Sequence, residues 1–132
     1  MVKSLVIASE FEAVRTAEEA VLKEAAHHGF RKGLLFAIKL AMEEGLNNAI
    51  RHGNGLDPRK MVHLDYEIDP DRVVIEIRDQ GKGFDPQDVP DPTADENLEK
   101  PTGRGIMLMR AYMDEVSFSR DGRHLRMIKR KT

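Results

Sequence analysis

The feature that most constrains the fold is one long amphipathic segment, from about Lys32 to His52. Its apolar residues recur at three- and four-residue spacing, which predicts a helix with one face toward a core. They are Leu34, Leu35, Ile38, Ala41, Met42, Leu46, Ala49 and Ile50. At about 21 residues this helix is long for a small domain, so we expect it to cross the whole core. The Gly53-Asn54-Gly55 that follows is typical of a helix end and turn.

The other side of this helix carries polar residues that suit phosphate chemistry. Glu44, Asn48 and His52 stand at i, i+4 and i+8, so they project from one face. An amide oxygen can ligate a hard cation such as Mg2+, and a carboxylate can deprotonate a water or hydroxyl. His52 is interpreted as a helix-end residue, because zinc would need three protein ligands. Taken alone, such a pattern is more often a solvated helix face than a site.

The composition is that of a soluble globular protein. The 132 residues are 40% apolar and 33% charged, which favours one domain over residues 1–132. The net charge of -2, without a long basic run, argues against a nucleic-acid surface. No cysteine is present, which excludes disulfides and thiolate metal sites. The apolar run near the N-terminus is too short for a signal peptide or membrane span, so we expect a cytoplasmic protein.

The first part of the chain predicts a strand and another helix. Residues 4–8 are aliphatic and β-branched, which favours a strand. Ser9 is expected to open a helix that runs to about His28, with Glu12 completing a capping box. Its apolar positions are Phe11, Val14, Ala17, Val21, Leu22 and Ala25.

The rest of the chain predicts two hairpins and a short helix, in the order β-α-α-β-β-loop-α-β-β. Residues 61–68 alternate between apolar and polar and pair with residues 73–79 across a short Asp/Pro turn. A helix is expected over 103–112, and a last hairpin turns at Asp121-Gly122. Basic residues in 120–131 are interpreted as the solvated face of an edge strand, with a surface for an acidic partner as the alternative. The fold class is therefore α+β, a two-layer sandwich of one mostly antiparallel sheet with helices on one face.

Two glycine-rich segments flank a long acidic loop. Asp79 leaves a strand and offers an acceptor for an exocyclic amine, while Gly81 and Gly83 leave room for a flat base. Gly103 and Gly105 open a helix, whose free N–H groups favour phosphate oxygens. Residues 85–102 contain four prolines and no periodicity, which indicates a lid or binding loop, with a plain surface insertion as the alternative.

Three motifs in this order resemble the nucleotide-binding boxes of GHKL-type ATPases. They are E-x-x-x-N-A-x-x-H from Glu44, D-x-G-x-G-F from Asp79, and G-x-G-I from Gly103. Three segments resemble those of the small bacterial anti-sigma-factor serine/threonine kinases, the RsbW-like proteins: NNAIRHGN, DQGKGFDP and TGRGIMLMRAYMDEV. The resemblance covers roughly residues 30–130 and implies the Bergerat (GHKL) fold, with ATP and Mg2+ as cofactors.

The resemblance also implies a role for each matching residue. Glu44 would be the catalytic base or water-positioning carboxylate, and Asn48 the Mg2+ ligand. Asp79 would bind the adenine amino group, in a base pocket lined by Gly81, Gly83 and Phe84. The residues against the triphosphate would be Gly103, Arg104, Gly105 and Ile106, although Arg104 reads equally well as an exposed residue at a helix start. Residues 85–102 would be the ATP lid.

The implied function is an ATP-dependent protein serine/threonine kinase that regulates transcription. Its expected partners are a STAS-type anti-anti-sigma protein, which it phosphorylates, and a sigma factor; a homodimer is expected, with no direct contact to nucleic acid or membrane. One alternative is a nucleotide-gated binding module without phosphotransfer. The ATPase domain of a histidine sensor kinase is disfavoured, since no helices with a phospho-accepting His precede residue 1.

The sequence departs from the family pattern at two places. A Gly-Thr pair, whose hydroxyl supports the adenine-binding Asp, is common near the end of such chains, whereas Gly122 is followed here by Arg123 and His124. Lys100 and Pro101 stand where some members have an Arg just before the last glycine motif.

Overall fold

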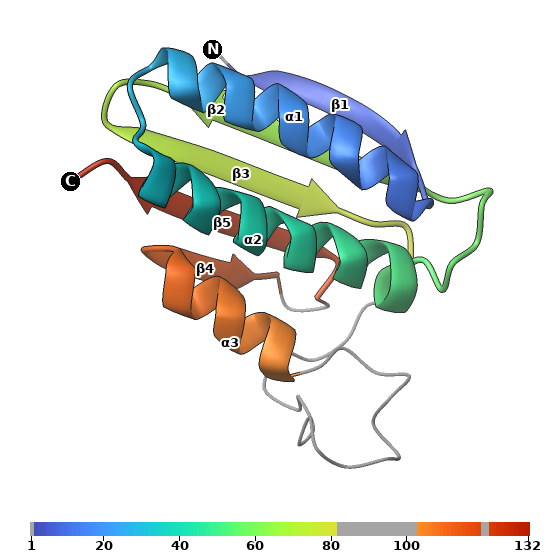
Figure 1. Cartoon of the computed structure of the whole chain (residues 1–132). Coiled ribbons are helices and arrows are strands. Elements are labelled where there is room, and N and C mark those ends of the chain that lie inside the picture. The colour runs from blue at the N-terminus through green and yellow to red at the C-terminus, as the bar shows by residue number, and fades with distance from the viewer. Residues whose placement is uncertain (1, 82–102, 120–121) are drawn as a thin grey trace.

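The computed structural model describes residues 2–81, 103–119 and 122–132 (Figure 1). The elements are β1 (Lys3–Ala8), α1 (Phe11–His27), α2 (Lys32–Asn48), the π-helical turn η1 (Ala49–Gly53), β2 (Met61–Ile68), β3 (Arg72–Arg78), α3 (Gly103–Tyr112), β4 (Glu115–Phe118) and β5 (His124–Arg130). This order is the predicted one.

The five strands form one sheet in the order β1-β2-β3-β5-β4, and each of its four pairings is antiparallel. Helices α1, α2 and α3 lie on one face of it (Figure 1). The predicted α+β, two-layer class with helices on one side is therefore confirmed. The expectation of an edge strand at 120–131 is wrong: the chain crosses through α3 to the edge at β4, then returns as β5 between β4 and β3.

Strand periodicity fixes which side chains enter the core. In β2 the buried residues alternate with half-buried ones, so Val62, Leu64, Tyr66 and Ile68 all face the helices, as predicted. β3 contributes Val73, Ile75 and Ile77 in the same way. Helix α2 buries the apolar side of the long segment against them, including Ile38, Met42 and Leu46.

The start of α1 differs from the prediction. The helix begins at Phe11 with Glu10 at the N-cap, and no side chain caps it. Ser9 is buried and donates its hydroxyl hydrogen to the Lys60 carbonyl oxygen at 2.6 Å, so the capping box with Glu12 is wrong. Phe11, one of the apolar positions expected to face the core, is 46% exposed as the first residue of the helix.

The end of α2 also differs from a regular helix to His52. The α-helical pattern stops at Asn48 and a wider π turn follows, closed by the Asn54 N–H donating to the Ala49 carbonyl oxygen at 2.8 Å. Gly55 then takes a positive φ of 61°. The ends of β1, η1 and β3 lie at one end of the molecule, on the right in Figure 1.

Candidate functional site

A small cavity lies between α2 and the sheet at this end of the molecule. Its walls come from the second half of α2 with η1, from the end of β3 and from the β4–β5 hairpin: Gly45, Asn48, Ala49, Gly53, Ile77, Asp79, Phe118, Gly122, Arg123 and Leu125. Two of the residues predicted from sequence, Asn48 and Asp79, therefore face the same space. The cavity holds about 20 Å³, room for a single water, so a purine requires its walls to move apart.

Gly45 lets α2 approach the sheet at this cavity. A Cβ at Gly45 would lie 2.8 Å from the Leu125 side chain and 3.0 Å from that of Ile77. Any larger residue would push the helix or these side chains outward and displace Asn48, which follows three residues later. Sequence reasoning did not single out Gly45; its signal is a glycine inside an otherwise apolar helix face.

Asn48 and Glu44 lie one turn apart on α2, as predicted. The Asn48 carboxamide lines the cavity, and its Nδ2 is buried with no hydrogen-bond partner in the described part of the chain. A buried amide nitrogen without a partner on a cavity wall is typical of a site that binds a polar ligand. Glu44 is half-buried and does not line this cavity. Burial, and then the neighbouring Glu43, raise the pKa of Glu44, in the direction that suits a general base.

Asp79 is held between the helix end and the final hairpin. Its backbone N–H donates to the Arg123 carbonyl oxygen at 3.0 Å, and its Oδ1 accepts from the Gly81 N–H at 2.9 Å. A Cβ on Gly53 would overlap the Asp79 carboxylate, and a Cβ on Gly81 would overlap the Gly53 carbonyl oxygen. Glycine is therefore required at both positions for the Asp79 turn to pack on η1.

A buried polar residue that sequence reasoning treated only as part of a turn, Asn54, joins three elements here. Its Oδ1 accepts from the Gln80 N–H at 2.7 Å. Its Nδ2 donates to the Ser9 hydroxyl at 2.9 Å and to the Met61 carbonyl oxygen at 3.0 Å. The Gln80 side chain closes the ring by accepting from the Met61 N–H at 2.8 Å. Asn54 thus fixes the turn that follows Asp79 against the ends of β1 and η1.

The last glycine segment begins α3, which packs against α2 (Figure 1). Arg104 is exposed, Gly105 is buried, and the Ile106 side chain belongs to the hydrophobic core at 4% exposure. Gly83, Phe84 and the predicted lid over 85–102 lie outside the described residues, so their assignments stay predictions.

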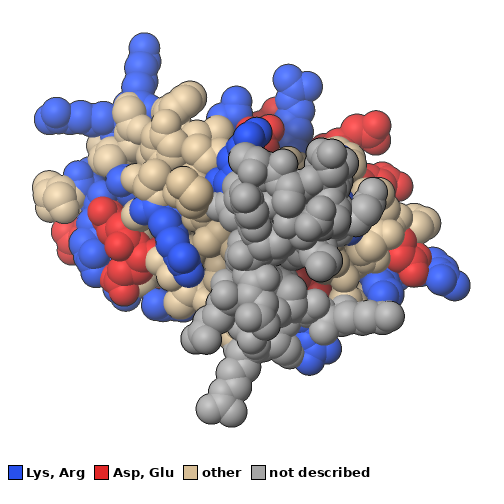
Figure 2. Space-filling view, turned by 90° about the horizontal axis from the view of Figure 1, so that it is seen from below, with Lys and Arg blue, Asp and Glu red and all other residues tan. Residues whose placement is uncertain are grey.

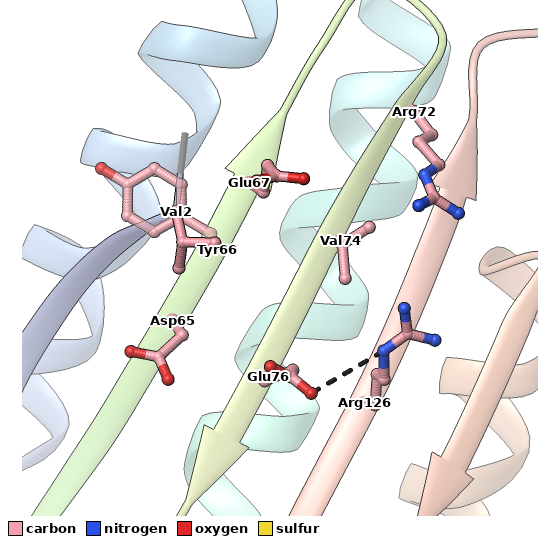
Figure 3. A pocket seen from close by; sticks show the side chains of 8 residues that line it. All are labelled: Val2, Asp65, Tyr66, Glu67, Arg72, Val74, Glu76 and Arg126. Carbon is pink, nitrogen blue, oxygen red and sulfur yellow. Dashed lines mark ion pairs between the residues drawn. The ribbon is translucent and has the colours of Figure 1, made fainter.

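A larger hollow lies on the other face of the sheet, which none of the described helices covers (Figure 3). It has a volume of about 260 Å³, and Glu76 and Arg126 form an ion pair at 3.7 Å in its wall. Every sequence-predicted site residue in the described part of the chain lies away from this hollow. It is therefore separate from the Asn48–Asp79 cavity.

Figure 2 shows basic and acidic side chains interspersed on one face of the molecule. Among the residues that the structure describes, no three His, Cys, Asp or Glu side chains gather to hold a metal by themselves. None of the described helices has the length and apolar content needed to cross a membrane.

Comparison with known proteins places this site in a family context. A family model described as histidine kinase-like ATPase domain matches residues 7–129. The chain is 36% identical over 86 residues to "Anti-sigma F factor" of Anoxybacillus flavithermus, covering 63% of this chain and 58% of that protein. It is 34% identical over 99 residues to "Serine-protein kinase RsbW" of Staphylococcus epidermidis, covering 69% of this chain and 62% of that protein.

A solved structure shares the fold. The crystal structure of the RsbU and RsbW domains of a Mycobacterium tuberculosis protein matches 97% of this chain and 32% of that one, with a TM-score of 0.63 and 16% identity. The matched region spans less than two thirds of the length of the curated relatives, 58% and 62% for the two above. Because the family model covers nearly the whole chain, this protein belongs to the histidine kinase-like ATPase domain family.

Proposed function

We propose that the protein is an ATP-dependent serine/threonine kinase of the anti-sigma type. The observation that carries the proposal is the cavity that Asn48, whose buried Nδ2 has no hydrogen-bond partner in the described chain, lines together with Asp79. Asp79 would accept a hydrogen bond from the adenine amino group. The Asn48 oxygen would be one ligand of a Mg2+ ion that arrives with the phosphates, since Mg2+ commonly binds through one or two protein oxygens plus substrate phosphates.

The transfer step needs positioning more than covalent help from the protein. The partner's serine or threonine oxygen bonds to the γ-phosphorus as the bond from that phosphorus to the β-bridging oxygen breaks, and ADP leaves. Glu44 would accept the hydroxyl proton, directly or through a water. Its raised pKa makes the carboxylate a stronger base than an ordinary glutamate. The magnesium ion, when bound, neutralises charge on the phosphate oxygens.

The proposed partners follow from the names of the relatives. Proteins called anti-sigma factor and serine-protein kinase are similar to this chain over most of its length. We therefore propose a sigma factor as one partner and a STAS-type anti-anti-sigma protein as the phosphate acceptor, with the kinase acting as a homodimer in the cytoplasm.

A second candidate is a nucleotide-gated binding module that transfers no phosphate. It is favoured by the position of Glu44, which does not line the Asn48–Asp79 cavity. Incubation with labelled Mg-ATP and a STAS domain encoded beside the gene separates the two. Phosphate on a serine or threonine of that domain supports the kinase, whereas ATP binding with an unmodified partner supports the module.

Two variants test the residue roles. Asn48→Ala should weaken Mg-ATP binding at least tenfold while the far-UV circular dichroism and melting temperature stay close to wild type, because the Asn48 Nδ2 makes no hydrogen bond within the described chain. Glu44→Gln should keep ATP binding and lower phosphate transfer by about 100-fold. Unchanged ATP affinity in Asn48→Ala, or full transfer in Glu44→Gln, would show that other groups carry these roles.

A further inference from the structure

A groove runs between α1 and α2 on the outer surface of the helix layer. It has a volume of about 430 Å³ and is lined by residues of α1, among them Phe11, Arg15 and Glu18, and by Lys39, Glu43 and Asn47 of α2. We call it the helix groove. It is separate from the Asn48–Asp79 cavity, with which it shares no lining residue.

The helix groove is lined by a carboxylate, Glu18, with one oxygen that has no hydrogen-bond partner in the described chain. Glu18 is only 6% exposed, and its Oε1 is buried with no hydrogen bond in the described chain. No other buried acid stands among the described residues, where the buried polar set is Ser9, Glu18 and Asn54. Burying a carboxylate oxygen without a hydrogen-bond donor lowers the stability of the fold. Its position in the groove wall therefore points to a ligand that supplies the missing donor.

The charges around Glu18 define what that ligand can be. Burial first, and then the negative charge of Glu43, raise the pKa of Glu18 to about 7; Lys39 and Arg15 act in the opposite direction, and Glu19 adds to the rise. The negative charge of Glu43 therefore lies close enough to Glu18 to disfavour the ionised form of Glu18. A cation placed between them would relieve both the repulsion and the missing hydrogen bond.

The two basic residues that line the groove, Arg15 and Lys39, do not occupy the space between Glu18 and Glu43 as ion-pair partners in the described structure. Arg15 is 85% exposed in its side chain and lies 3.8 Å from Glu19, on the solvent side. Lys39 is exposed and forms no ion pair with Glu18 or Glu43 in the described structure. Neither base therefore forms an ion pair with Glu18 among the described residues, although the charges of both lower the pKa of Glu18.

One end of the groove has an apolar wall. The Phe11 ring is 46% exposed, and the Arg51 guanidinium lies 5.8 Å from its centre. This ring offers a face for an aliphatic stem, in the manner of a lysine side chain packed along an aromatic ring. The groove thus combines two acceptors with a flat apolar surface.

We propose that the helix groove binds an alkylammonium group, with its nitrogen between Glu18 and Glu43 and its aliphatic stem against Phe11. A free diamine and a lysine side chain of a protein both present this chemistry. The helix groove shares no residue with the Asn48–Asp79 cavity, so amine binding can be tested whether or not the protein is a kinase.

The test titrates the full chain with 1,5-diaminopentane and with the peptide acetyl-Gly-Lys-Gly-amide, followed by NMR. Wild type should bind one or both, and binding should strengthen about tenfold between pH 6 and pH 8 as Glu18 ionises. Glu18→Gln should bind about tenfold more weakly at pH 8 and lose the pH dependence, the effect expected for one charge-assisted hydrogen bond. Tighter peptide binding identifies a protein lysine as the source; tighter diamine binding identifies a free amine.

Three controls make the result decisive. Glu12→Gln removes an exposed acid of the same helix outside the groove and should leave binding unchanged. The neutral analogue 1,5-pentanediol should not bind at the concentrations that saturate the diamine. Equal amine binding in wild type and Glu18→Gln would overturn the proposal. So would a Glu18 pKa near the ordinary value that rises in Lys39→Met, because Lys39 would then fill the position itself.

Discussion

Two buried polar side chains, Asn54 and Glu18, show opposite uses of a polar group in one small core. Asn54 is 2% exposed and uses its oxygen and its nitrogen in hydrogen bonds to Gln80, Ser9 and Met61. Glu18 is 6% exposed and has an oxygen with no partner. A satisfied buried group fixes geometry, whereas an unsatisfied one destabilises the fold until a ligand or proton arrives. Asn54 therefore has a structural role beside the Asn48–Asp79 cavity, whereas Glu18 marks the proposed binding site in the helix groove.

The strongest test of this contrast is Asn54→Ala. The substitution leaves the Gln80 N–H and the Met61 carbonyl oxygen without their buried partner, so we expect a loss of about 3 kcal/mol in the free energy of unfolding. Urea denaturation monitored by circular dichroism measures it. Asn47→Ala is the matched control, because Asn47 lies on a helix surface and should change stability by less than about 0.5 kcal/mol. If Asn54→Ala lost as little stability as the control, the hydrogen bonds of Asn54 would not stabilise the fold.

Much of the fold on which this contrast rests could be predicted from sequence. Period-two alternation in residues 61–68 and helical spacing in 32–48 survive in the structure because burial on one face enforces both. The order of elements and the single helix-covered face followed from the same patterns. The edge assignment of the last strand failed, because which strands become neighbours depends on contacts between distant segments that no local pattern encodes.

The site was predicted less completely. Asn48 and Asp79 line one cavity, as the motifs suggested, whereas Gly45 and Asn54 were missed. Asn54 lies in a Gly-Asn-Gly run that reads as a plain turn; its importance comes from partners 45, 26 and 7 residues away along the chain. The capping box at Ser9 failed for the same reason, since the hydroxyl bonds to the distant Lys60 carbonyl instead of to its own helix.

The second test concerns pH and Glu18. Its carboxyl binds a proton more tightly in the folded chain, at a pKa of about 7, than at the ordinary value of 4.5. Stability therefore falls as pH rises from about 4.5 to about 7 and stays at the lower level above that range. Glu18→Gln mimics the protonated form and escapes this loss. We expect it to be more stable than wild type by about 2 kcal/mol at pH 8 and nearly equal at pH 5.

Urea denaturation of both proteins at the two pH values measures this difference, and titration of all other groups cancels in the comparison. Glu43, Glu19, Lys39 and Arg15 face or flank Glu18 and remain present in both proteins. Glu12→Gln should show no such pH-dependent gain. If Glu18→Gln gained nothing at pH 8, Glu18 would be as well satisfied as Asn54, and the contrast between the two residues would be lost.

The smallest expected effect sharpens the Asn54 side of the comparison. Ser9→Ala removes the donor to the Lys60 carbonyl oxygen and one acceptor of the Asn54 Nδ2, which keeps its bond to the Met61 carbonyl oxygen. We expect a loss of about 1 kcal/mol in the free energy of unfolding. The double variant with Asn54→Ala should then lose about 1 kcal/mol less than the sum of the single losses, because both substitutions break the same hydrogen bond. Strict additivity would mean that Ser9 and Asn54 act separately, and that the β1 end is not tied to the Asp79 turn through this pair.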